Sequence, residues 1–175
     1  MTANVVGVAG WKNSGKTTLV TKLVGELRRR GYRVATVKHA HHDFDIDREG
    51  TDSYRHRAAG ASEVVLVSAR RWALIHELDK QREPTLVEIL QKLAPSDVVV
   101  VEGYKREPIP KIEVRRQDAA HTEPLAPQDP SVIGIAADHP CEAAGRPVFG
   151  LDDVAGITDL VLSHFRLGAN RSDAT

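Results

Sequence analysis

The stretch GWKNSGKT, residues Gly10 to Thr17, constrains this chain more than any other feature. It fits the pattern G-x-x-x-x-G-K-[ST], the P-loop, in which backbone N–H groups surround the phosphates of a nucleotide and the following helix adds its dipole. The motif lies between an apolar run, Asn4–Ala9, and a segment from Lys16 to Arg30 that carries apolar residues at helical spacing. Because this is the strand–loop–helix context that the motif requires, we predict a nucleotide-binding site.

The positions of the motif have distinct expected roles. Lys16 is predicted to reach the β- and γ-phosphates and to act in catalysis, and Thr17 to place its hydroxyl on Mg²⁺. The other residues predicted to bind the nucleotide here are Gly10, Trp11, Lys12, Asn13, Ser14, Gly15 and Thr18. The alternative is a structural glycine-rich turn that matches the pattern by chance.

A P-loop protein also needs an acid at the end of a neighbouring strand, where it organises Mg²⁺ or water. The stretch DVVVVEG, Asp97–Gly103, offers an acid at each end. Ligands lie at the carboxyl ends of parallel strands, so we predict Glu102 as a metal ligand and catalytic residue. Asp97 is expected to point away from the phosphates, and we interpret it as a solvated acid that precedes the strand.

A stretch rich in histidine and aspartate, KHAHHDFDIDREGTD, follows the second predicted strand. One interpretation is a loop that faces the phosphates and Mg²⁺, with Asp45 or Asp47 close to the metal. A second is a transition-metal site formed by His39 with His41 or His42. A third is a plain surface loop. We adopt the first for the site prediction, which assigns His39 to the nucleotide and Asp45 to the metal.

The remaining pattern predicts an α/β protein. Strand–helix–strand units imply a parallel sheet, so we expect a three-layer fold of the P-loop NTPase type with a mainly parallel sheet and a possible β-hairpin extension. Further strands are predicted at Val34–Val37, Glu63–Ser68, Trp72–Glu77, Asp97–Gly103, Lys111–Arg115, Val132–Ala136 and Pro147–Phe149, and further helices at Thr51–Ala59, Pro84–Leu93 and Asp152–Phe165. Lys111–Arg115 alternates in polarity and is interpreted as an edge or hairpin strand suited to pairing with a second subunit. Residues 1–167 are expected to form a single domain, followed by a disordered tail at 168–175.

Composition excludes several classes of protein. The 24 basic and 24 acidic residues balance, so no net field favours general binding to nucleic acid or to an anionic membrane. One cysteine, Cys141, allows neither a disulfide framework nor a cysteine-based zinc site. No run approaches the roughly 20 apolar residues of a membrane helix, and the apolar amino terminus is too short for a signal peptide. We expect a soluble, cytoplasmic protein that binds neither nucleic acid nor membrane.

Three stretches are together more specific than the P-loop alone: GWKNSGKTTL, VKHAHHDFDIDREGTDSYRHRAAGA and VVVVEGYKREPIPKIEV. The chain resembles the molybdopterin-guanine dinucleotide biosynthesis protein B family, MobB, from Val5 to about Phe165. The resemblance implies a homodimeric accessory protein that binds GTP, hydrolyses it weakly, and assists the enzyme that joins GMP to molybdopterin. Its partners would be GTP, molybdopterin or the molybdenum cofactor, and that guanylyltransferase.

The resemblance also implies roles for individual residues. Gly10 and the run from Asn13 to Thr18 would hold phosphates and Mg²⁺. The neighbouring loop would contain His39, His41, Asp45, Asp47 and Asp52, and a second acidic motif would be Glu102-Gly103-Tyr104-Lys105.

The usual guanine-reading sequence of GTPases, Asn-Lys-x-Asp, is absent. The nearest substitute is AADHP, in which Asp138 follows the strand Val132–Ala136 and is predicted to accept hydrogen bonds from guanine N1 and N2. An aspartate that caps the loop is the competing interpretation. The expected preference for guanine therefore depends mainly on the resemblance.

The favoured chemistry is phosphoryl transfer to water, with Glu102 or a loop acid orienting the water. No arginine finger or water-positioning glutamine is assigned, so we expect turnover on the order of 10⁻⁴ to 10⁻² s⁻¹. One alternative is a small-molecule kinase whose lid would contain Arg70, Arg71, Lys105, Arg106, Arg115 and Arg116. The other is a binding module that uses GTP or molybdopterin without hydrolysis.

Overall fold

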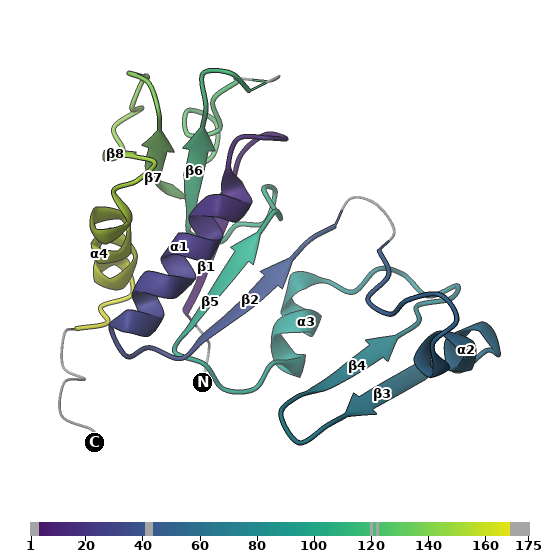
Figure 1. The fold of residues 1–175 in the computed structure, drawn as a ribbon. Coiled ribbons are helices and arrows are strands. Elements are labelled where there is room, and N and C mark those ends of the chain that lie inside the picture. The colour runs from purple at the N-terminus through teal and green to yellow at the C-terminus, as the bar shows by residue number, and fades with distance from the viewer. Residues whose placement is uncertain (1–3, 41–43, 120, 122, 169–175) are drawn as a thin grey trace. The chain divides into compact units, whose positions relative to one another are not determined.

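The computed structural model describes residues 4–40, 44–119, 121 and 123–168 (Figure 1). The chain forms two compact units. The sheet unit comprises Met1–His39 and Lys92–Thr175, and the hairpin unit comprises Ala40–Gln91. The single domain expected over residues 1–167 stays a prediction. The tail expected to be disordered lies outside the described residues after Gly168.

Six parallel strands form the sheet of the sheet unit, in the order β2-β5-β1-β6-β7-β8. Their bounds are β1 (Asn4–Ala9), β2 (Val34–Lys38), β5 (Val98–Glu102), β6 (Lys111–Arg115), β7 (Val132–Ala137) and β8 (Val148–Gly150). Strand β5 lies between β1 and β2 and reads VVVVE, the near-continuous apolar run of a strand covered on both faces. The expected α/β fold with a mainly parallel sheet is confirmed.

Strand β6 corrects one prediction. It is an interior strand that pairs in parallel with β1 and β7, and all five of its residues are buried. The alternating charges of Lys111, Glu113 and Arg115 had indicated an edge exposed to water. Within the sheet these side chains meet protein groups instead of water: Glu113, for example, accepts hydrogen bonds from Arg115 and from the backbone N–H groups of Leu125 and Ala126. The interpretation as an edge or hairpin strand is therefore wrong.

Helices α1 (Lys16–Arg29) and α4 (Val154–His164) cover one face of this sheet (Figure 1). Helix α1 begins after Gly15, whose positive φ of 93° ends the P-loop, and it buries Leu19, Leu23 and Leu27. These leucines recur at helical spacing and pack with the apolar residues of β1, β5 and β6. This packing holds the amino terminus of α1 at the carboxyl end of β1, where the P-loop lies.

The hairpin unit contains the expected β-hairpin. Strands β3 (Glu63–Val67) and β4 (Trp72–His76) pair antiparallel, between helices α2 (Asp52–Ala58) and α3 (Leu86–Lys92) in the chain. The unit is held by an arginine on α2: the Arg57 guanidinium donates hydrogen bonds to the carboxylates of Asp45, Asp47 and Glu77. In the described parts of both units, no helix is long and apolar enough to cross a lipid bilayer.

Candidate functional site

The P-loop follows β1 and lies directly against β6. A Cβ on Gly10 would come within 2.6 Å of the carbonyl oxygen of Val114, so only glycine fits there. Asn13 and Gly15 also have positive φ, at 63° and 93°. Ser14 is buried, and in the described part of the chain its hydroxyl has no hydrogen-bond partner. The predicted phosphate-binding residues thus form one tight loop that leads into α1.

The ammonium group of Lys16 lies over its own loop. Its Nζ donates a hydrogen bond to the carbonyl oxygen of Trp11 at 2.7 Å. Burial lowers the pKa of Lys16 below its ordinary value; the charge of Glu102 opposes this shift, whereas the nearby charges of Lys105 and Lys38 add to it. Three cations therefore lie near one carboxylate, an arrangement that an added anion would stabilise.

The side chains of Glu102 and Thr17, both predicted as magnesium ligands, are in direct contact. The Thr17 hydroxyl donates to Glu102 Oε1 at 2.7 Å, and Lys38 Nζ lies 3.3 Å from the same oxygen. The parallel register places Glu102 opposite Val8, near the start of the P-loop. Glu102 is only 8% exposed, so water does little to solvate its charge. Hydroxyl and carboxylate oxygens are ligands that suit Mg²⁺, and the pair fits this ion, although metal binding itself stays a prediction.

Asp97 lies at the opposite end of β5, as expected, but it is not a solvated acid. Its carboxylate accepts a hydrogen bond from the backbone N–H of Arg33 at 2.7 Å, and its side chain is about 10% exposed. Its backbone carbonyl accepts from the Asn4 amide. Asp97 therefore ties together the starts of three strands, a structural role that corrects our interpretation.

Two loops hold the indole of Trp11, a feature that sequence reasoning missed. The ring nitrogen donates to the carbonyl oxygen of Glu123 at 2.7 Å, Lys105 Nζ lies 3.7 Å from the ring centroid, and the His121 ring centroid lies at 5.4 Å. The cation–π contact joins the predicted second acidic motif to the P-loop. An aromatic residue inside a P-loop, with a lysine after the Glu-Gly acid, was the available signal.

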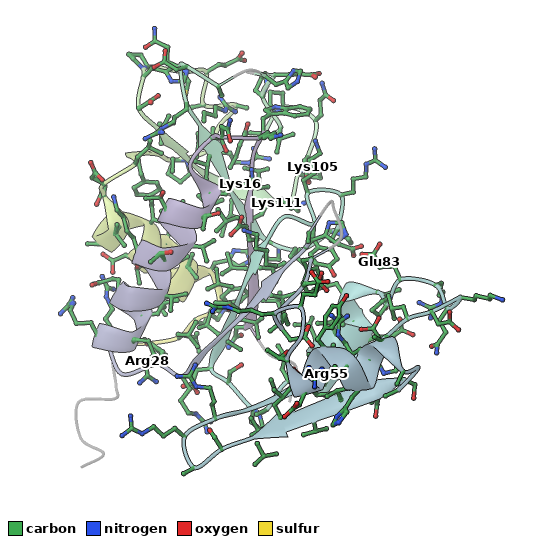
Figure 2. All side chains as sticks on the ribbon, turned by 45° about the vertical axis from the view of Figure 1, so that its right-hand side comes forward. Lys16, Arg28, Arg55, Glu83, Lys105 and Lys111 are labelled. Carbon is green, nitrogen blue, oxygen red and sulfur yellow. The ribbon has the colours of Figure 1, made fainter. Side chains whose placement is uncertain are left out.

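A buried lysine, Lys111, binds the loop that carries Lys105. Lys111 Nζ donates to the carbonyl oxygens of Lys105 and Glu107 and to the carboxylate of Asp129, at 2.9, 2.6 and 2.8 Å, and the residue is 1% exposed. Figure 2 shows Lys16, Lys105 and Lys111 toward the same end of α1, away from Arg28 at its other end. Lys111 thus holds the loop that carries Lys105, the residue whose side chain contacts Trp11.

A pocket of about 460 Å³ lies beside the amino terminus of α1. It is lined by Gly15, Thr18, Leu19, Lys22, Arg116, Ala137, Asp138, Gly150, Leu151, Asp152 and Asp153. Its position, next to the P-loop and at the carboxyl ends of β6 and β7, is where parallel sheets place ligands.

Asp138 stands in the wall of this pocket. Its Oδ1 accepts a hydrogen bond from the backbone N–H of Gln117 and lies 2.9 Å from His139 Nδ1, while Oδ2 lies 3.7 Å from Arg116 Nε. The hydrogen bonds with His139 and Gln117 lower the pKa of Asp138, so its carboxylate stays ionised at neutral pH. The predicted loop-capping contacts are thus present, in the same wall that a base would meet.

The structure describes only part of the histidine and aspartate stretch. His39 directly follows β2, and its backbone N–H donates to the carbonyl oxygen of Glu102. His41 and His42 lie outside the described residues. Asp45 belongs to the hairpin unit, where its carboxylate accepts from Arg57. No group of three or more His, Cys, Asp or Glu side chains that could hold a metal ion occurs within residues 4–40, 44–119, 121 and 123–168. The roles of His39 and Asp45 stay predictions.

Comparison with known proteins places this geometry in a family. The family model for MobB, described as molybdopterin guanine dinucleotide synthesis protein B, matches residues 5–138. A molybdopterin-guanine dinucleotide biosynthesis adapter protein of Haemophilus influenzae is 39% identical over 167 residues, covering 92% of this chain and 90% of that protein. Its Escherichia coli counterpart is 38% identical over 160 residues, with 90% and 91% covered.

Solved structures agree with the sequence comparison. A crystal structure of molybdopterin-guanine biosynthesis protein B has a TM-score of 0.69 and 26% identity over 91% of this chain and 99% of the other. The Bacillus subtilis MobB structure has a TM-score of 0.69 and 28% identity, with 91% and 96% covered. The match to the family model, the two close relatives and the shared fold lead to one conclusion: this chain belongs to the MobB family of molybdopterin guanine dinucleotide biosynthesis.

Proposed function

We propose that the chain is a cytoplasmic, GTP-binding accessory protein that hydrolyses GTP slowly and assists the conversion of molybdopterin to molybdopterin guanine dinucleotide. One observation carries the proposal: a P-loop whose Thr17 contacts the buried Glu102 stands beside a pocket that contains Asp138. The first part of this arrangement suits phosphates and a metal, and the second suits a base. The relatives named as biosynthesis adapter proteins support the pathway role.

Phosphate binding follows from the charges around the loop. An incoming phosphate would compete with the Trp11 carbonyl oxygen for Lys16 Nζ, and a doubly charged oxygen cluster is the stronger acceptor. The same phosphate would offer an acceptor to the Ser14 hydroxyl, which has no hydrogen-bond partner among the described residues. It would also restore the pKa of Lys16, because the charge that burial disfavours would then have an anionic partner.

We propose that Thr17 and Glu102 hold Mg²⁺. A magnesium ion held there would supply positive charge against the charge that develops on the phosphate. Glu102 can serve either as this ligand or as the group that orients the attacking water, and Lys16 stabilises the charge on the transferred phosphate. Without a water-positioning glutamine or an arginine finger, turnover stays on the order of 10⁻⁴ to 10⁻² s⁻¹. Such a rate suits an adapter that delivers GTP better than it suits a metabolic catalyst.

We propose that Asp138 reads the base. Guanine presents two donors, N1–H and N2–H, side by side, and a carboxylate presents two acceptors. Adenine presents an acceptor at N1, which would face the ionised carboxylate unfavourably. Since the pKa of Asp138 is lowered, this discrimination would persist throughout the neutral range. The proposed partners are then GTP, molybdopterin and the guanylyltransferase that joins GMP to it.

We also propose that the protein is a homodimer. Strand β6 lies inside the sheet and cannot provide the pairing edge, so the support comes from the β3–β4 hairpin. Val65, Val67 and Trp72 are 57, 78 and 69% exposed, and an exposed apolar surface of this kind marks an interaction site. Sedimentation equilibrium tests this: a dimer that becomes a monomer in the Val67→Thr/Trp72→Thr variant is expected, and a monomeric wild type contradicts it.

The experiment that tests the function is calorimetric titration with GTP and ATP, each with Mg²⁺, on the wild type, Lys16→Ala and Asp138→Asn. We expect a preference for GTP of about tenfold or more, equal to about 1.4 kcal/mol. Lys16→Ala should abolish binding of both nucleotides, and Asp138→Asn should remove the preference. Equal or stronger binding of ATP would favour the small-molecule kinase, and GTP binding without any hydrolysis, even with the partner enzyme present, would favour the pure binding module.

A further inference from the structure

Strand alternation directs Arg116 toward the nucleotide side of the sheet. In β6 the side chains of Ile112 and Val114 pack in the core beneath α1, whereas the intervening Glu113 and Arg115 form their buried pair on the other face. Arg116 is the next residue on the α1 side, just beyond the end of the strand. It therefore projects past the core at the level where the P-loop turns into α1.

The surroundings of Arg116 join the two halves of the proposed site. Its Nε lies 3.9 Å from the position that a Cβ on Gly15 would take, at the start of α1. The same Nε lies 3.7 Å from Asp138 Oδ2, and all three residues line the pocket. One guanidinium thus stands between the end of the P-loop, where phosphates bind, and the proposed base reader.

The contact between Arg116 and Asp138 is weak enough to be exchanged. A separation of 3.7 Å is an ion pair without a hydrogen bond, and the Arg116 side chain is 51% exposed. Lys22, the other cation in the pocket wall, is 2.5 Å from Asp152 and pairs with that carboxylate. A phosphate at the amino terminus of α1 would offer Arg116 two charge-assisted hydrogen bonds, which a guanidinium forms well.

We propose that Arg116 is a nucleotide-binding residue that leaves Asp138 for the phosphate chain when the nucleotide enters, and so frees Asp138 Oδ2 for the base. The inference rests on the proposed function, because it takes the pocket to be the nucleotide site. It assigns affinity for the phosphates to Arg116 and selectivity for guanine to Asp138. Binding of the phosphates at one end of the pocket thereby frees Asp138 at the other end to bind the base.

The test is calorimetric titration of GDP and ADP with Mg²⁺ on Arg116→Gln, Arg116→Lys and the wild type. We expect Arg116→Gln to lower the affinities for GDP and for ADP by about the same factor, about tenfold for a lost charge-assisted contact. The ratio of GDP affinity to ADP affinity should stay unchanged or rise. Arg116→Lys should recover part of the loss, since a point charge replaces a fork of donors. Because the side chain is half exposed, we expect both variants to fold like the wild type, and thermal unfolding curves check this directly.

Arg33→Gln is the matched control. Arg33 forms the same kind of loose ion pair, 3.8 Å to Asp97, at the amino-terminal end of the sheet, so its loss should leave both affinities unchanged. If Arg116→Gln lowers only the GDP affinity, Arg116 merely orients Asp138 and the proposal is overturned; it is equally overturned if neither affinity changes. A wild type that binds neither GDP nor GTP would instead refute the proposed function.

Discussion

Strands β5 and β3 have similar valine-rich sequences, yet they differ sharply in burial. In β5, the valines 98 to 101 are at most 1% exposed, whereas in β3 Val65 and Val67 are 57 and 78% exposed. Strand β5 pairs with β1 and β2 and contributes to the core beneath α1, while in the part of the chain that the structure describes β3 pairs only with β4. The comparison teaches that composition sets what a strand can bury, and its neighbours decide what it does bury.

The two units also differ in how they hold charge. The sheet unit buries Lys111 completely, against two carbonyl oxygens and Asp129. The hairpin unit gathers carboxylates around Arg57, including Asp45, which remains 67% exposed. Removing the partner of a buried charge costs more stability than removing the partner of a charge that stays in contact with water. We therefore expect substitutions in the sheet unit to have the larger effects.

The largest effect is expected for Lys111→Met. Asp129 and two carbonyl oxygens would lose their shared donor inside the protein, so the free energy of unfolding should fall by about 3 to 5 kcal/mol. Urea denaturation followed by circular dichroism measures this change. The exposed Lys80→Met serves as the control, with an expected change within about 0.5 kcal/mol. A loss below about 1 kcal/mol for Lys111→Met would show that the buried charge is dispensable.

Leucine truncation compares the two units directly. Leu23→Ala removes a side chain with no exposed surface from the core of the sheet unit and should cost about 2 to 5 kcal/mol of unfolding free energy. Leu66→Ala in β3 removes one that is 41% exposed and should cost less than about 1 kcal/mol. Denaturant titration of both variants checks the difference. Equal costs would mean that the hairpin surface is covered in solution, as in the proposed dimer.

Substitution of Arg57 should act locally. Arg57→Gln would leave the carboxylates of Asp45, Asp47 and Glu77 close together without their shared cation, so the hairpin unit should open more readily. Hydrogen exchange should then accelerate within Ala40–Gln91 and stay unchanged in β1 and β5. Arg57→Lys, which keeps the charge, should show a smaller acceleration. Uniform acceleration across the chain would contradict the separation into two units.

The smallest expected effect is a loss of stability in the hairpin unit at low pH. Hydrogen bonds from Arg57 hold the pKa of Asp47 below its ordinary value of 3.8. A depressed pKa means that the folded state favours the ionised form, so this stabilisation is present above pH 3.8 and is lost as the pH falls through the lowered pKa. Protection of the hairpin unit against exchange, measured relative to the intrinsic exchange rate at each pH, should therefore fall upon acidification below that value. Asp47→Asn should remove most of this pH dependence, and an undiminished response in that variant would assign it to other carboxylates.

Much of the fold was predictable because its signals are local. The P-loop lies between an apolar strand and an amphipathic helix, and β3 and β4 are adjacent along the chain. The error at β6 arose because its partners are not local: Lys111 pairs with Asp129, and Glu113 accepts from Leu125 and Ala126 in a later loop. Alternating charge looks the same whether water or a distant loop satisfies it.

The sequence by itself determined the P-loop, since Gly10 and Gly15 adopt conformations that favour glycine, and Lys16 and Thr17 follow at set positions. It also carried enough of the family pattern to identify MobB. Sequence reasoning also proposed Glu102 and Asp138 for the site, but only the tertiary structure decided which side chains lie next to that loop. Parallel pairing brings the carboxyl ends of β5, β6 and β7 to one edge, and Glu102, Arg116 and Asp138 arrive there from strands far apart in the chain. No local sequence pattern encodes strand order and register, and these two features bring Glu102, Arg116 and Asp138 to the same edge of the sheet.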